Sequence, residues 1–290
     1  MTSDFQMPPL PPGLGIGPGS QPESPDGVKL ETMEIPREMF TFHMPVAPEP
    51  EDTLGMEEAK QRLREIRDLL ARWKVGEPAG VVDLSDLDQK NLGLVNQILG
   101  EGEVSMVSGP RIQVQESVFA GLWRVVHFDE DGTIARDTVE VGDWPSAVAG
   151  RVFEGAADLP EPASDPLPEG VFNAPPLLTE IAEKVPQAGP GVPVHTINLS
   201  LLPHSEADLD YLARKLGVGD TIVLSRGYGN CRVSATRTRN VWWVQYFNSQ
   251  DTLILNSLEI IPVPEVILAA QEDIDDSARR LAEVMRLYDE

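Results

Sequence analysis

The sequence has almost no cysteine and no apparent targeting segment. Its single cysteine, Cys231, cannot form a disulfide within the 290-residue chain. No Lys or Arg precedes Lys29, which argues against a secretory signal with a charged start. No apolar run reaches the roughly 18 residues that a membrane-spanning helix requires. These absences predict a soluble protein of the reducing cytoplasm, with no direct insertion into a membrane.

Positive charge is also scarce. Lys and Arg together number 23 against 47 Asp and Glu, which gives a formal net charge of -24. Such a field repels phosphate groups, so nucleic acid is not an expected partner. The same field suits a basic partner.

Residues with the usual catalytic or metal-binding patterns are missing too. Ser225 lacks the flanking glycines of a nucleophile elbow, and one cysteine with scattered histidines cannot complete a closed tetrahedral zinc site. The four histidines, none at the spacing of a metal-binding helix, are His43, His127, His195 and His204. We therefore expect no catalytic residue, no metal site, no cofactor and no enzymatic activity. A hydrolase is the alternative, but no site for one can be named.

Composition and periodicity divide the chain into four parts. Residues 1–53 form a Pro/Gly-rich extended arm that ends near MFTFHMP, an alternating segment that either packs on the protein itself or docks a partner. Residues 54–150 hold an amphipathic helix (54–74) and a first repeat. Residues 151–194 read as a Pro-rich linker with a short helical candidate, LLTEIAEKV. Residues 195–290 hold a second repeat and a closing helix, about 270–288.

The two repeats share identities over most of their length. Leu92, Leu99, Gly100 and Ser108 match Leu209, Leu216, Gly217 and Ser225; Trp123, Val125, Phe128, Glu140 and Pro145 match Trp242, Val244, Phe247, Glu259 and Pro264. Matches held over such a span indicate an internal duplication.

Each repeat predicts a strand, a helix and three further strands. The helix begins at a capping residue, Asp88 or Ser205, and ends at Gly100 or Gly217. A unit of this size is marginally stable alone. The expected fold class is therefore α+β, with two β-α-β-β-β units packed as one pseudo-symmetric body, flanking helices and the N-terminal arm.

The repeats differ most in the turn SRGYGNCRV. The first repeat has only Gly109-Pro110 there, whereas the second has a longer turn in which two glycines flank a tyrosine. Tyrosine is a favoured interface anchor. With one tryptophan, this turn forms the predicted partner-binding set: Arg226, Gly227, Tyr228, Gly229, Asn230, Cys231, Arg232 and Trp243. The alternative is a hairpin that grew without a function.

Two neighbouring features support the same interpretation. Arg226, Arg232, Arg237 and Arg239 form a basic island that binds either a partner or the protein's own carboxylates. Arg124 in the first repeat implies that its strand face reaches solvent, so the matching Trp243 is expected on an accessible apolar surface. The alternative is that Trp243 packs beneath a helix.

Cys231 offers a second chemistry. A thiol beside arginines can have a lowered pKa and be reactive, or it can share a soft metal site that a partner completes. The alternative is an inert, buried cysteine.

The run SRGYGNCRVSATRTRNVWWVQYFNSQDTLILNSLEI, with LPHSEADLDYL before it and PVPEVILAAQEDIDDSARRLAE after it, resembles the C-terminal conserved region of the HupH/HyaF hydrogenase expression and formation proteins. MEIPREMFTFHMPVAPEPED resembles the opening segment of the same family. The first repeat looks like a weaker copy of that conserved region.

This resemblance implies an accessory role in maturing a nickel–iron uptake hydrogenase. It implies a chaperone or scaffold that acts on the iron–sulfur small-subunit precursor before twin-arginine export, with other hydrogenase accessory proteins as further partners. The alternative is a redox or iron–sulfur cluster delivery protein acting through Cys231.

Overall fold

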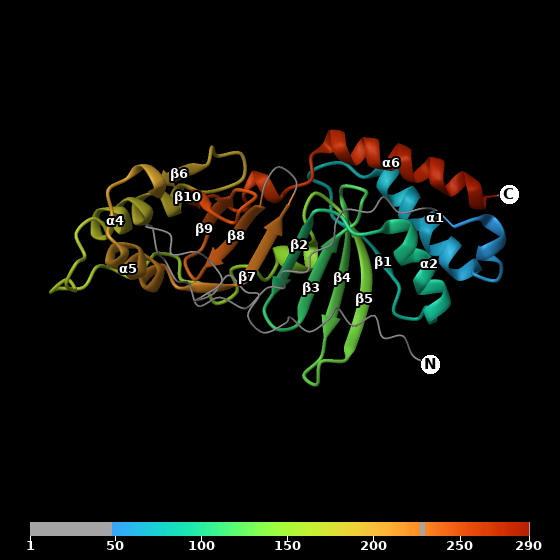
Figure 1. The fold of residues 1–290 in the computed structure, drawn as a ribbon, viewed down its shortest axis with the longest axis horizontal. Helices are drawn as coiled ribbons and strands as arrows, with labels where there is room; N and C mark the ends of the chain where they lie inside the picture. Colours follow the sequence, from blue (N-terminus) through green and yellow to red (C-terminus); the bar gives the residue numbers. More distant parts are fainter. Residues whose placement is uncertain (1–47, 227–229, 290) are drawn as a thin grey trace. The chain divides into compact units, whose positions relative to one another are not determined.

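The computed structural model describes residues 48–226 and 230–289 (Figure 1). The chain divides into two compact units. Residues 48–152 and 266–289 make up the first unit, and the described residues of Phe153–Glu265 make up the second. Most of the predicted arm, including the MFTFHMP segment, lies outside the described residues.

The first unit is a five-stranded antiparallel sheet with helices. The strands are in the order β1-β5-β4-β3-β2. The elements, in chain order, are the 3-10 turn η1 (Pro50–Thr53), α1 (Glu57–Arg72), β1 (Gly80–Asp83), α2 (Gln89–Leu99), β2 (Val104–Ser108), β3 (Ile112–Glu116), β4 (Leu122–Phe128), β5 (Ile134–Val141), the short α3 (Ser146–Ala149), α6 (Gln271–Met285) and η5 (Arg286–Tyr288).

The second unit repeats this plan. Its strands are antiparallel in the order β6-β10-β9-β8-β7. The elements are α4 (Ala174–Lys184), η2 (Val185–Gln187), β6 (His195–Asn198), η3 (Leu199–Leu201), α5 (Glu206–Leu216), β7 (Val218–Ser225), β8 (Asn230–Thr236), β9 (Val241–Phe247), β10 (Leu253–Ile260) and η4 (Glu265–Ile267). Each unit thus has the order α-β-α-β-β-β-β.

The mixed α+β class is confirmed, but the expected three strands after each helix is wrong. Four strands follow it, because the segment expected as one strand folds back on itself in both units. Gly121 takes φ of 81° between β3 and β4, and Asn240 takes φ of 60° between β8 and β9. Glycine and asparagine tolerate this left-handed conformation, which allows the tight turn. The packing of the repeats into one pseudo-symmetric body stays a prediction.

The predicted helix boundaries of the repeats are confirmed. The Asp88 carboxylate accepts a hydrogen bond from the backbone N–H of Asn91 at the start of α2. Ser205 and Asp208 form a reciprocal capping box at the start of α5. Gly100 and Gly217 follow the two helices with positive φ.

The C-terminal helix belongs to the first unit. Ile274, Leu281 and Met285 of α6 are buried in one cluster with the apolar stripe of α1, which includes Leu63 and Ile66. Figure 1 shows α6 running alongside α1. The predicted division placed this helix with the second repeat, since sequence order does not show which sheet an apolar stripe covers.

Helix α4 lies in the range predicted as a linker, yet it is part of the second core. Ala174, Leu178 and Ile181 pack with Leu209 and Leu212 of α5. The same apolar cluster includes four residues of β9 and β10, namely Val241, Trp243, Leu258 and Ile260. α4 therefore has the structural place in the second unit that α1 has in the first.

Candidate functional site

The predicted site lies at the β7–β8 end of the second sheet. Gly227, Tyr228 and Gly229 lie outside the described residues. Beside them, Asn230 Nδ2 donates a hydrogen bond to Asp251 Oδ1 at 3.1 Å. The start of β8 therefore lies beside the turn between β9 and β10.

Arg226 belongs to the same end of the sheet. It is half-buried. Burial lowers the pKa of its guanidinium, and the negative charge of Asp251 opposes that shift. Asp251 thus lies close to both Arg226 and Asn230.

Trp243 is buried, so the expectation of an accessible apolar surface there is wrong. Its exposed fraction is 3 %, and it packs under α4 and α5. The indole Nε1 donates to Asn256 Oδ1 at 2.5 Å. The expectation rested on solvent access at Arg124, but that guanidinium is itself largely buried and paired with Asp137. Trp243 packs beneath helices, as the alternative held.

Cys231 is buried on the opposite face of β8. Its cross-strand neighbour is Tyr246, with which the thiol shares a hydrogen bond. Burial raises the pKa of the thiol to about 11. The expected lowering of this pKa is wrong, because strand alternation directs the adjacent Arg232 to the other face.

Arg232 is the most unusual member of the set. It is 2 % exposed, and burial lowers the pKa of its guanidinium to about 10. Nε and Nη2 are buried and have no hydrogen-bond partner in the described chain. Unlike Cys231, Arg232 shares its face of the sheet with Trp243, since its cross-strand neighbour Gln245 lies two residues from Trp243.

The outer arginines of the basic island are paired with the protein's own carboxylates. Arg237 Nη2 lies 3.1 Å from Asp220 Oδ1, and Arg239 Nε lies 3.0 Å from Asp158 Oδ1. The second of the two alternatives therefore holds for these residues. Exposed pairs of this kind contribute little stability, but they reduce the positive charge that is free to attract a partner.

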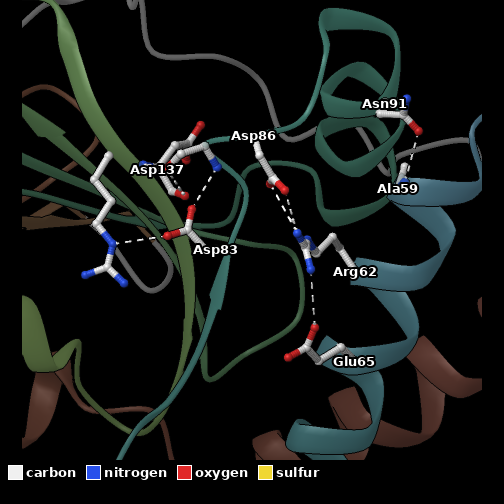
Figure 2. Close-up of polar contacts among 9 residues, drawn as sticks. Ala59, Arg62, Glu65, Asp83, Asp86, Asn91 and Asp137 are labelled. Atoms are coloured by element: carbon white, nitrogen blue, oxygen red, sulfur yellow. Dashed lines mark hydrogen bonds and ion pairs between the residues drawn. The ribbon is translucent and has the colours of Figure 1, made fainter.

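Sequence reasoning missed a contact between helices that each unit makes. In the first unit, Asn91 Oδ1 accepts from the backbone N–H of Ala59 at 3.0 Å, as Figure 2 shows. In the second unit, Asp208 Oδ1 accepts from the N–H groups of Phe172, Asn173 and Ala174 at 2.8–2.9 Å. Both residues stand one position before the matched leucines Leu92 and Leu209, which is the signal that could have located them.

A second set of contacts in Figure 2 connects α1 with the loop before α2. Arg62 Nη2 lies 2.8 Å from Asp86 Oδ2, and Arg62 Nη1 lies 3.9 Å from Glu65 Oε2. These ion pairs lie within the first unit and involve none of the predicted site residues.

Within residues 48–226 and 230–289, no three His, Cys, Asp or Glu side chains come together as metal ligands. Over the same residues, every helix is too short or too polar to cross a bilayer.

The fold places the chain in a class of α+β proteins built from two units of the same plan. The family model for the "HupH hydrogenase expression protein, C-terminal conserved region" matches residues 56–158 and again residues 171–288. The chain belongs to this family of hydrogenase expression and formation proteins. The two matches cover both repeats, which accords with the internal duplication.

Named relatives span most of the chain. It is 44% identical over 273 residues to hydrogenase expression/formation protein HoxQ of Cupriavidus necator, covering 93% of this chain and 95% of that one. It is 43% identical to HupH of Rhodobacter capsulatus, covering 98% of each. It is 37% identical to the hydrogenase-1 operon protein HyaF of Escherichia coli, covering 70% and 71%.

Among solved structures, the hydrogenase expression protein HupH from Thiobacillus denitrificans is similar in sequence. It is 34% identical and covers 41% of this chain and 97% of its own, with a TM-score of 0.36. That score is too low to bear on the fold.

Proposed function

We propose that the protein is a non-enzymatic chaperone or scaffold for the iron–sulfur small-subunit precursor of a nickel–iron uptake hydrogenase, acting before twin-arginine export. The observation that carries the proposal is family membership. The relatives that span the chain are named hydrogenase expression/formation proteins. Other hydrogenase accessory proteins are further partners under this proposal.

Charge supports this choice of partner. The chain carries a formal net charge of -24, whereas a twin-arginine signal is basic. Opposite fields accelerate encounter, and dissolved salt screens them over about 10 Å at 0.1 M. Capture of the precursor is therefore expected to weaken as ionic strength rises.

The β7–β8 end of the second unit is the proposed contact surface. Arg226 and Asn230 frame it, and the longer turn supplies Tyr228 as the anchor. Trp243 is packed among residues of α4 and α5, and Cys231 lies on the opposite face of β8 from Arg232, so both are assigned a supporting role inside the surface.

A pull-down tests the proposal. Tagged protein is recovered from cells that make the hydrogenase, with the precursor either intact or lacking its signal segment. We expect the intact precursor to co-purify and Tyr228→Ala to reduce its recovery at least about tenfold, the loss expected of an interface anchor. Tyr246→Phe, which changes a tyrosine inside the second sheet, is the matched control. Unchanged recovery with folded Tyr228→Ala would refute the surface, and failure of the wild type to retain precursor would refute the function.

Cluster delivery through Cys231 is the second candidate, and burial with a raised pKa counts against it. Cys231→Ser separates the two functions. A scaffold predicts normal hydrogenase maturation in air with this variant, and no iron in the purified eluate. Loss of maturation together with loss of bound iron would favour delivery.

A further inference from the structure

We infer that Arg232 is the receptor for a carboxylate that the described chain does not itself supply. The donors are the Nε–H and Nη2–H groups, which form one edge of the guanidinium. The inference rests on the proposed function in one respect only, namely that the carboxylate belongs to the hydrogenase precursor. The site itself follows from the geometry of the second unit.

The two unpaired nitrogens are the pair that suits a carboxylate. Nε–H and its neighbouring Nη2–H point in parallel, so they can donate to both oxygens of one carboxylate. Arg124 in the first unit uses the same two nitrogens, which bind Oδ1 and Oδ2 of Asp137. In the second unit the corresponding edge of Arg232 has no acceptor among the described residues.

The cross-strand neighbours of Arg232 include no acid, and a further buried donor lies on the same face of its strand. Its cross-strand neighbours are Leu224 on β7 and Gln245 on β9, neither of which carries negative charge. Ser234, two residues along the same face of β8, is buried, and its hydroxyl also lacks a partner in the described chain. Arg232 Nε, Arg232 Nη2 and the Ser234 hydroxyl are therefore three buried donors on one face of the sheet, and none has an acceptor in the described chain.

Energetics favour an anion over a neutral acceptor. A guanidinium remains charged at physiological pH, and buried charges in proteins are almost always paired. The first repeat has Gln113 at the corresponding position, where cross-strand pairing sets it beside Val126. The charge is thus a feature of the second repeat and not a requirement of the duplicated fold.

Thermal unfolding of the full chain tests the site with formate, the smallest carboxylate probe. Wild type is compared in about 100 mM sodium formate and equal sodium chloride. We expect formate to raise the Tm by about 3 °C, because a ligand that binds only the native state stabilises that state against unfolding. Arg232→Gln, which installs the residue type of the first repeat, should abolish the difference. Arg237→Gln, at an exposed and paired arginine, should retain it.

Two results would overturn the site. One is a wild type that responds equally to formate and chloride, which would leave internal water as the partner of Arg232. The other is a formate response that survives in Arg232→Gln. If Arg232→Gln does not fold, Arg232→Lys keeps the charge without the two-donor edge and should still reduce the response.

The pull-down then identifies the source of the carboxylate. Arg232→Gln should lower precursor recovery at least about tenfold relative to Arg237→Gln. A formate response with unchanged recovery would overturn the precursor as the source and assign the site to a free carboxylate. A wild type that retains no precursor would refute the proposed function, while the formate experiment still decides the site.

Discussion

The two repeats fix one corner of their sheets with the same pair of residues. Trp123 Nε1 donates to the carbonyl of Gly142 at 2.8 Å, and Trp242 Nε1 donates to that of Ile261 at 3.1 Å. Each tryptophan lies across the sheet from a glutamate, Glu140 in the first unit and Glu259 in the second. Buried indoles with satisfied N–H groups are therefore what both units retain.

The repeats differ at their other buried polar positions. Next to the shared tryptophans, the first unit has Arg124 bound to Asp137, and the second has Trp243 bound to Asn256 at the matching positions. One unit thus uses a buried ion pair where the other uses a neutral pair. The comparison teaches that the duplicated fold tolerates either pair, provided that both partners change together.

Breaking the ion pair is the change with the largest expected effect. Arg124→Ala leaves the buried Asp137 carboxylate without its cation, which typically costs about 3–5 kcal/mol of unfolding free energy. Urea denaturation of the full chain measures the loss.

The matched graft transfers the second unit's pair into the first. The graft combines Arg124→Trp with Asp137→Asn. Because the indole needs more room, Asn96, which accepts a hydrogen bond from Arg124 Nη1, is also changed to Ala. Ala213 stands at the corresponding position of the second unit. The triple variant should be more stable than Arg124→Ala. A cost below about 1 kcal/mol for Arg124→Ala would show that the pair is not what holds this face together.

The sequence reveals this difference only in part. Matching Trp123 with Trp242 places Arg124 opposite Trp243, but the partners Asp137 and Asn96 lie far along the chain, so the arginine's burial was not predictable. The capping residues and helix ends were predictable because they depend on neighbours within a few positions. Gly121 and Asn240 are local turn signals, but the β-rich residues on either side of each favour one continuous strand. The short helix LLTEIAEKV was predicted and is confirmed as part of α4, but the prolines around it indicated a linker, so its place in the second core was missed.

The candidate site was likewise predictable only in part from the sequence. The alternation of β8 separates Cys231 from Arg232, and this could have been deduced from the sequence. That Arg232 has no acceptor depends on what β7 and β9 place beside it, which only the register reveals.

The contact between helices gives the next largest effect. Burial alone would raise the pKa of Asp208, but backbone hydrogen bonds from Ser205, Ala174, Phe172 and Asn173 outweigh it and bring the pKa to about 2. Asp208→Asn should cost about 2 kcal/mol at pH 7, since an amide cannot replace a charged acceptor of several N–H groups.

The pH dependence follows from the sign of this shift. The pKa of Asp208 is lower in the folded state, so its contribution is complete above about pH 4 and is lost as the pH falls towards 2. Urea midpoints of wild type and Asp208→Asn should therefore converge between pH 4 and 2. The reverse graft, Asn91→Asp, should also destabilise, because Asn91 Nδ2 donates to the Asp88 carboxylate. A constant difference between wild type and Asp208→Asn down to pH 2 would contradict the charged contact.

Glu116 marks another difference between the two sheets, and its pKa is raised where that of Asp208 is lowered. It faces Trp123 across the strands, where the second unit has Ala235 facing Trp242. Burial raises the pKa of Glu116 to about 7, and the negative charges of Glu103 and Asp273 add to the shift.

A raised carboxyl pKa favours the protonated folded state, so stability should fall as the pH rises from about 4.5 through 7. Glu116→Gln should come closest to wild type below about pH 4.5 and exceed it by about 1 kcal/mol at pH 8.5, since solvent screening keeps the gain modest. Asp273→Asn should give a smaller gain of the same sign. Parallel pH profiles of wild type and Glu116→Gln would refute this assignment.

The smallest change in stability is expected at the matched glutamates, Glu140 in the first unit and Glu259 in the second. In the first unit, Glu140 Oε2 accepts from the Ser146 hydroxyl at 2.8 Å. The matching position in the second unit is Glu265. There burial raises the pKa of Glu259, and the charge of Glu265 raises it further.

Glu265→Ser installs the first unit's donor and removes the repulsion. The variant should gain less than about 1 kcal/mol at pH 7.5, because the pair is only partly buried. Glu265→Gln removes the repulsion without installing serine, so a larger gain for Glu265→Ser isolates the hydroxyl's contribution. Since Glu259 is destabilised in its charged form, both gains should shrink as the pH is lowered and this group protonates. Gains that grow at low pH would show that the corner of the second sheet is held by some other interaction than the one that Glu140 and Ser146 make in the first.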